Sequence, residues 1–151
     1  MQLTLYTDYS LRTLIYLEIH GDKLSTIGEI AEFYQISRNH LVKVVHNLVL
    51  KGYIISTRGK GGGLSLSGKA IDINIADVVM DTEPHFNVVE CFDAESPACT
   101  VEPVCRLKAV LGRATDAFLA ELRRYTLADM VSCAVEEGAE TAVKWFPRKP
   151  S

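Results

Sequence analysis

The sequence predicts a mainly α-helical fold with one small β-hairpin and a long C-terminal helix. Three patterns carry this prediction: two short amphipathic segments around a tight turn between residues 25 and 52, a β-branched and glycine-rich stretch between residues 53 and 67, and a long apolar stripe between residues 104 and 135. With 151 residues, of which 48% are hydrophobic, the chain is long enough to fold around its own core.

Three helices are expected in the N-terminal half. The first covers about residues 8–20, where leucine and isoleucine recur at helical spacing, and Gly21 ends it. The second, "STIGEIAEFY", opens with Thr26 and a glutamate three residues later, which is the pattern of a capping box. The third, "SRNHLVKVVHNLVLKGY", begins at Ser37, a favourable N-cap, and ends at Gly52. Its expected buried face consists of Leu41, Val44, Val45, Leu48 and Val49.

The second and third helices, joined by a tight turn, form the pattern of a helix-turn-helix, and a basic hairpin after it is typical of a winged helix. The hairpin stretch "YIISTRGKGGGLSLS" carries Arg58 and Lys60 at its tip. Because the same order of elements occurs in many small domains, the charge distribution is decisive. Residues 33–71 contain six lysines and arginines and no acidic residue, which suits a polyanion and favours binding to DNA.

The start of the third helix is expected to meet the base edges of double-stranded DNA. Asn39 suits adenine, and Arg38 suits guanine or a phosphate. Lys51 and Lys60 are expected at phosphates, and Arg58 in the minor groove. The complete predicted DNA-contact set is Thr26, Ser37, Arg38, Asn39, His40, Lys43, Lys51, Arg58 and Lys60.

The second half of the chain begins with a short helix, "INIADVVMDTE", and an acidic loop: residues 76–105 contain seven acidic residues and no lysine or arginine. From residue 104 to about residue 135 the pattern is helical, with a break near Tyr125. Such a helix has more apolar surface than its own domain can cover, so it is expected to pair with the same helix of a second subunit. Packing of this helix on the first helix of its own chain is the alternative, and the two can occur together. The expected organisation is a DNA-binding domain (1–80), a cluster-binding loop (81–103), dimerisation helices (104–137) and a disordered tail (138–151).

Three cysteines, Cys91, Cys99 and Cys105, lie in the acidic loop, and Cys133 is far downstream. The N-terminus does not have the pattern of a secretory signal, so a cytoplasmic protein with reduced thiols is expected and a disulfide is disfavoured. A structural zinc site usually has closer pairs of cysteines, whereas an iron–sulfur cluster accepts wider spacings. The residues therefore favour a cluster over zinc, with inert cysteines as a third interpretation.

Several motifs together carry a resemblance to a known family. They are "TDYSLR", "SRNHLVKVVHNL", "RGKGGGLSL", the three loop cysteines, "CRLK" and "FLAELRRYTLADM", in order over residues 1–133. They resemble the bacterial winged-helix regulators that include the iron–sulfur regulator IscR, and among these the repressors that sense nitric oxide. The resemblance implies a homodimeric repressor with one [4Fe-4S] or [2Fe-2S] cluster per subunit, held by Cys91, Cys99 and Cys105. Reaction of the cluster with nitric oxide would release the repressor from operator DNA.

The fourth ligand of such a cluster is a separate question. IscR-like members have a histidine three residues after the third cysteine, where this chain has Lys108, whose ammonium has no lone pair. The resemblance implies Asp8 instead, reaching the cluster of the partner subunit. The competing interpretation makes Asp8 the N-cap of the first helix. Further candidates are His85, Glu90 and Cys133, of which Cys133 also suits a helix core.

The expected function is therefore a bacterial, cytoplasmic repressor that responds to nitric oxide and has no membrane role. An alternative is an iron- or redox-responsive regulator with the same fold and cluster. An enzyme is not expected, because the sequence contains neither a Ser/His/Asp arrangement nor a phosphate-binding loop that opens a helix.

Overall fold

The computed structural model describes residues 2–93, 95 and 99–136, apart from the side chains of residues 102 and 133–136. The predicted tail, residues 138–151, lies outside this part. The elements are α1 (Leu5–Ile19), α2 (Ile27–Tyr34), α3 (Arg38–Leu50), β1 (Ile54–Thr57), β2 (Gly63–Leu66), η1 (Ala70–Asp72), α4 (Ile75–Thr82), η2 (Glu90–Phe92), η3 (Glu102–Val104), α5 (Arg106–Leu122) and α6 (Leu127–Glu136). The predicted fold class, mainly α-helical with a small hairpin, is confirmed.

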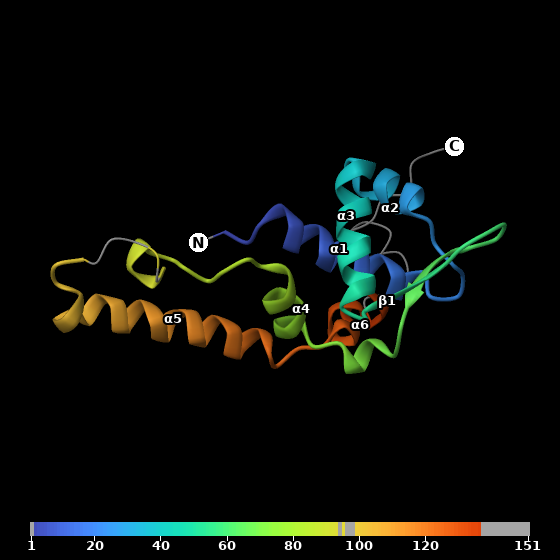
Figure 1. Ribbon diagram of the computed structural model, residues 1–151. Helices are drawn as coiled ribbons and strands as arrows, with labels where there is room; N and C mark the ends of the chain where they lie inside the picture. Colours follow the sequence, from blue (N-terminus) through green and yellow to red (C-terminus); the bar gives the residue numbers. More distant parts are fainter. Residues whose placement is uncertain (1, 94, 96–98, 137–151) are drawn as a thin grey trace.

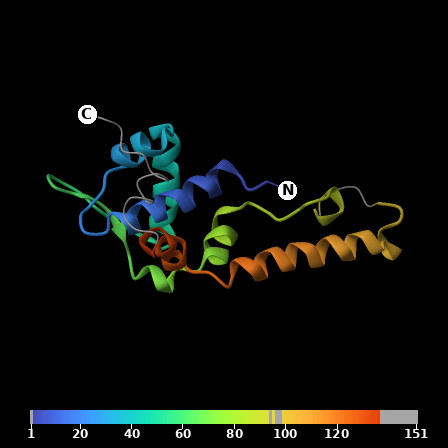
Figure 2. The same cartoon turned by 180° about the vertical axis from the view of Figure 1, so that it is seen from behind.

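The first three helices and the hairpin gather at one end of the molecule, and α5 projects away from them (Figure 1). Seen from behind, α6 returns to this body beside α1 (Figure 2), and α1 contacts α3, α4 and α6. Fully buried leucine and isoleucine side chains from successive helices fill the space between them: Leu14, Ile30, Leu41 and Leu48. The core therefore fixes α3 against α1.

The ends of α2 and α3 follow local sequence rules. The predicted capping box is confirmed: the Thr26 hydroxyl accepts from the Glu29 amide, and the Glu29 carboxylate accepts from the Thr26 amide at 2.6 Å. The hydrogen bond from the Thr26 backbone lowers the pKa of Glu29. The turn after α2 is made by Gln35 in the left-handed conformation, with φ 58°. Ser37 occupies the N-cap position of α3, and its side chain makes no capping hydrogen bond.

The core face of α3 is largely as predicted. Leu41, Val44, Val45 and Leu48 are at most 5% exposed, while Val49 is only partly buried and packs at the edge of the same cluster. The opposite face of α3 is left to solvent.

The hairpin is an antiparallel pair in which Ile54 faces Leu66 and Thr57 faces Gly63. The segment before α2 joins the pair, because Ser25 and Leu64 exchange two backbone hydrogen bonds of 3.0 and 2.7 Å. A Cβ atom on Gly63 would lie 2.9 Å from the Cβ of Leu24, so glycine permits this close approach. The glycine-rich stretch thus attaches the hairpin of β1 and β2, called the wing below, to the segment before α2.

The long C-terminal helical pattern is divided into two helices with different surroundings. Thr126 starts α6 by a reciprocal arrangement with Asp129, whose carboxylate accepts from the Thr126 amide at 2.7 Å. Leu127 is fully buried in the core, and α6 contacts α1 and η1. The part of the C-terminal stretch that packs on the first helix is therefore α6, while α5 has no buried residue. No helix in the described residues is long and apolar enough to span a membrane.

A cluster of three polar side chains connects the segment after α3 to α4. The Lys51 ammonium lies 2.7 Å from one oxygen of Asp81, and the Tyr53 hydroxyl donates to the other oxygen at 2.7 Å. The hydrogen bond from Lys51 holds the pKa of Asp81 below its ordinary value of 3.8. Burial, with the hydrogen bond to Asp81, raises the pKa of Tyr53.

Asp81→Asn is expected to reduce the free energy of unfolding at neutral pH. Because the folded carboxyl has the lower pKa, its contribution is present above the unfolded value and disappears as the pH falls through the folded value. The difference from the parent should therefore shrink below about pH 4. Urea unfolding of both proteins at neutral pH and near pH 3 measures this, with Asp72→Asn as an exposed control. A difference that stays constant over this range would contradict the assignment.

Candidate functional site

The solvent-facing side of α3 carries most of the residues predicted to contact DNA. Ser37, Arg38, Asn39, His40 and Lys43 are all exposed. Two further residues, Val42 and His46, are exposed on the same helix and were not in the predicted set. Helical spacing was the available signal, because both fall outside the predicted buried face: Val42 follows Arg38 by four residues, and His46 follows Val42 by four.

A hollow of about 510 Å³ lies between the wing and the starts of α2 and α3, and it brings two of the predicted residues together. Thr26 and Arg38 line it, together with wing residues that include Ser56 and Thr57. The Thr26 hydroxyl accepts the capping hydrogen bond and keeps its own O–H as a donor on this surface. The hollow therefore joins the helix-turn-helix and the wing in one concave surface.

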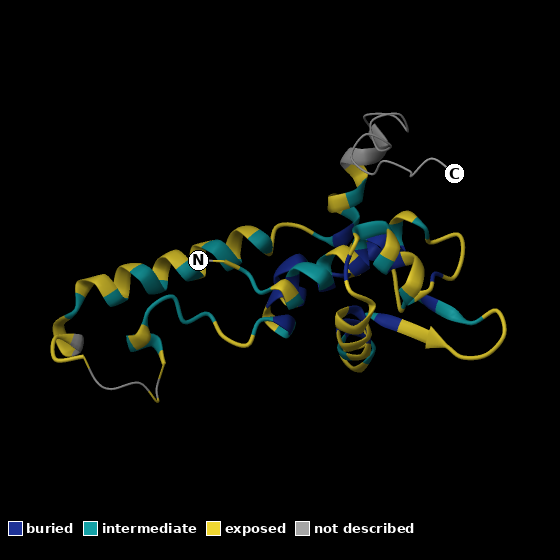
Figure 3. Cartoon of the chain, turned by 90° about the horizontal axis from the view of Figure 1, so that it is seen from above, coloured by how far each residue is buried: buried dark blue, intermediate teal, exposed yellow. Residues whose placement is uncertain are grey.

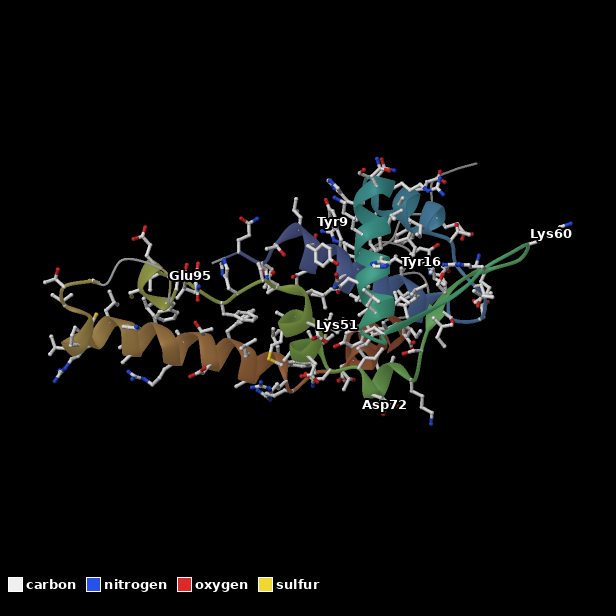
Figure 4. The ribbon with its side chains drawn as sticks, in the orientation of Figure 1. Tyr9, Tyr16, Lys51, Lys60, Asp72 and Glu95 are labelled. Carbon is white, nitrogen blue, oxygen red and sulfur yellow. The ribbon has the colours of Figure 1, made fainter. Side chains whose placement is uncertain are left out.

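The predicted basic residues outside α3 have different positions. Arg58 and Lys60 are exposed in the turn between β1 and β2, and Figure 4 shows Lys60 at the far end of the hairpin. Lys51 lies at the other end of the body beside α4, paired with Asp81. A phosphate contact by Lys51 would therefore compete with this ion pair.

Asp8 does not cap α1, so the N-cap interpretation was wrong. Thr4 is the N-cap residue and its hydroxyl accepts from the Thr7 amide. The helix therefore starts earlier than predicted, and Glu83, far along the chain, accepts from the Thr4 amide at 2.6 Å. Asp8 lies within the helix, partly exposed, and forms an ion pair of 2.9 Å with Arg12.

The residues on either side of Asp8 connect α1 to the start of α3. The Tyr6 hydroxyl donates to the Lys43 carbonyl at 3.3 Å, and the Tyr9 ring stacks on His40 with centroids 6.5 Å apart. Figure 4 shows Tyr9 against α3. The Arg12 guanidinium, besides pairing with Asp8, lies 5.8 Å from the centre of the Tyr34 ring at the end of α2. A displacement of α1 near Asp8 would therefore reach both helices of the helix-turn-helix.

The three loop cysteines are free thiols in different settings. Cys91 lies half-buried in η2, Cys99 is exposed, and Cys105 is the half-buried N-cap residue of α5, with its sulfur 3.4 Å from the Lys108 amide. Within the described residues, no three Cys, His, Asp or Glu side chains are close enough to hold a metal ion. The donor chemistry fits an iron–sulfur cluster, whose usual ligands are thiolates. The described residues of one chain do not preassemble the site.

The other candidate ligands are scattered along the same loop. His85 is exposed, and its Nδ1 accepts from the Asn87 amide at 3.4 Å. Glu90 is exposed at the start of η2. The side chain of Cys133 lies outside the described part of the chain. No single candidate is favoured over Asp8 by these positions.

No residue of α5 is buried, and exposed residues alternate with half-buried ones along its length (Figure 3). Leu107 is 63% exposed and Val110 49%, and Val104 just before the helix is 82% exposed. Soluble proteins seldom leave a continuous apolar stripe of this kind in water.

The helix-turn-helix consists of α2 and α3, and α3 is exposed and cationic on its outer face. Together with the basic hairpin of β1 and β2, this arrangement defines a winged-helix DNA-binding regulator. The chain belongs to the Rrf2 family, described as iron-dependent transcriptional regulators, which matches residues 3–133. It is 53% identical to the HTH-type transcriptional regulator NsrR of Bacillus subtilis (strain 168), over 87% of this chain and 90% of that relative. The resemblance predicted from the sequence is thus confirmed, and the chain is a transcriptional regulator and not an enzyme.

Solved structures agree with this assignment. CymR of B. subtilis, the global cysteine regulator, has a TM-score of 0.70 and 26% identity, with 87% of this chain and 97% of that chain covered. T. potens IscR has a TM-score of 0.71 and 23% identity, with 91% of each chain covered, and supports the fold alone.

Proposed function

We propose that this regulator is a repressor that binds operator DNA as a homodimer and responds to nitric oxide through an iron–sulfur cluster. The observation that carries the proposal is a group of three free thiols, Cys91, Cys99 and Cys105, in the segment between α4 and α5. Glu83, the first residue of this segment, accepts a hydrogen bond from the Thr4 amide at the N-terminus of α1. One end of the candidate sensor is thereby joined to the helix that supports α3.

The cluster would be held by the three cysteines and by Asp8 of the partner subunit, one cluster per subunit, of the [4Fe-4S] or [2Fe-2S] type. When bound, it would supply iron that reacts with a diatomic gas. A carboxylate holds such iron less firmly than a thiolate does, which makes the Asp8 position the expected point of entry. Asp8 would then have to leave Arg12. The pair is exposed and contributes little stability, so this exchange is inexpensive.

The proposed organisation assigns residues 1–80 to DNA binding, 81–103 to the cluster and 104–137 to dimerisation. The apolar stripe of α5, in which no residue is buried, supports the proposed dimer, because a second copy would cover it. We place the protein in the bacterial cytoplasm, where thiols stay reduced.

A second candidate is a regulator of the same architecture that responds to iron supply or redox state. The description of the family as iron-dependent favours it. Visible absorption of anaerobically purified protein tests for the cluster, since a protein with zinc alone is colourless. Addition of nitric oxide then separates the two candidates.

Arg38→Ala and Asn39→Ala are each expected to weaken operator binding by about 1–3 kcal/mol and to relax specificity, because both side chains are exposed at the start of α3. Fluorescence anisotropy with operator and random duplexes measures both effects. Arg124→Ala is the matched control, since it removes an exposed arginine that is paired with Glu121 on α5. If both α3 variants bind the two duplexes as the parent does, this face is not the reading surface.

Asp8→Ala is expected to allow cluster assembly but to make the cluster more labile and DNA binding less dependent on it. Asp8→Cys is expected to restore retention and slow the response to nitric oxide. Arg12→Gln is the control, because it breaks the same ion pair and leaves the carboxylate. The rate of anaerobic loss of visible absorption reports retention. If Arg12→Gln reproduces Asp8→Ala, the ion pair and not a ligand bond explains the effect.

A further inference from the structure

Val42 is an exposed apolar residue on the face of α3 that carries the predicted DNA contacts. Its side chain is 47% exposed, whereas its neighbours Leu41 and Val44 are 0% and 1% exposed. Residues three and four apart on a helix lie side by side, so Val42 is flanked by Arg38 and Asn39 on one side and His46 on the other. An apolar group thus sits within a polar and cationic surface.

The fold gives no reason for valine at this position. The core face of α3 is filled by Leu41, Val44, Val45 and Leu48 without it. A β-branched side chain also has a lower helix propensity than alanine, because its rotamers are restricted against the preceding turn. An exposed valine here therefore suits a partner outside the chain better than it suits the helix.

We propose that Val42 contacts the C5-methyl group of a thymine in the major groove and selects thymine at that position of the operator. The thymine methyl is the apolar group that base pairs present on this edge, and aliphatic side chains pack against it. The cationic neighbours Arg38 and Lys43 favour a close approach to DNA, so the isopropyl group would be desolvated there. This inference rests on α3 being the reading helix, as proposed above, and adds a specificity determinant to it.

The test uses the full chain and a duplex selected by it from random DNA. Each thymine of that duplex is replaced singly by deoxyuridine, which keeps base pairing and O4 and lacks the C5-methyl. One replacement is expected to weaken binding of the parent about four-fold, as expected for burial of roughly one methyl group. The same replacement should not weaken binding of Val42→Ser, and thermal unfolding of this variant should match the parent.

Leu50→Ser is the matched control, because Leu50 is an apolar residue of the same helix, 71% exposed, about 12 Å further along the axis. It should keep the parent's deoxyuridine penalty. A parent that is insensitive to every replacement overturns the inference, as does a Val42→Ser variant with an unchanged penalty. A parent that selects no sequence at all instead removes the proposed function, so the two failures are distinguishable.

Discussion

Replacing any one of Cys91, Cys99 and Cys105 by serine is expected to abolish retention of the iron–sulfur cluster. Thiolates provide most of the binding energy for iron in such a site, and a serine hydroxyl is a poor substitute. The loss should be equal for the exposed Cys99 and the half-buried Cys91 and Cys105, because each would serve one iron. Iron and sulfide analysis with visible absorption, on anaerobically purified protein, measures the effect.

Cys133→Ser is the control for these variants, since it removes a thiol outside the loop. It is expected to keep iron and sulfide at the level of the parent. A loop variant with a full complement of both would contradict the three-cysteine assignment. Loss of the cluster in Cys133→Ser alone would instead identify a different ligand set.

Leu111→Asp is expected to convert the proposed dimer into a monomer. Leu111 belongs to the apolar stripe of α5, which no residue of the described chain covers completely. If two copies bury this stripe against each other, an aspartate would place a charge in an apolar interface at a cost of several kcal/mol per subunit. Light scattering over a range of concentrations gives the mass directly.

Ala109→Asp is the matched control on α5. Ala109 is exposed, and helix geometry puts it on the opposite side from Leu111, so it introduces the same charge away from the stripe. It is expected to remain dimeric. A dimeric Leu111→Asp protein, or a monomeric Ala109→Asp protein, would reject the stripe as the main contact.

Features set by neighbours in the sequence were predictable. The capping box of Thr26 and Glu29 spans three residues, and the buried face of α3 follows from helical periodicity. The same periodicity pointed to the exposed side of α3, although Val42 is apolar and has no hydrogen-bonding side chain that would mark it as a DNA contact.

Features that depend on distant residues were not predictable. The contact between the start of α1 and Glu83, 79 residues from Thr4, is one such feature. The N-cap itself is local, because Thr4 caps the helix through the Thr7 amide, and Asp8 was a misplaced choice between two nearby candidates. Lys51 is engaged by Asp81, 30 residues away, which the charge count in the acid-free interval could not anticipate. The break of the C-terminal stripe near Tyr125 was predicted and separates α5 from α6. Which of the two helices enters the core depends on contacts of Leu127 with distant residues, which periodicity alone does not reveal.

We propose that a cluster held by the loop thiols controls DNA binding by the winged helix. The most direct measurement is an anaerobic titration of the protein–operator complex with nitric oxide, with visible absorption and anisotropy of labelled DNA recorded together. We expect the cluster bands to decline and the DNA to be released over the same range of nitric oxide, and added EDTA alone to do neither. DNA that stays bound after the bands have collapsed would contradict it.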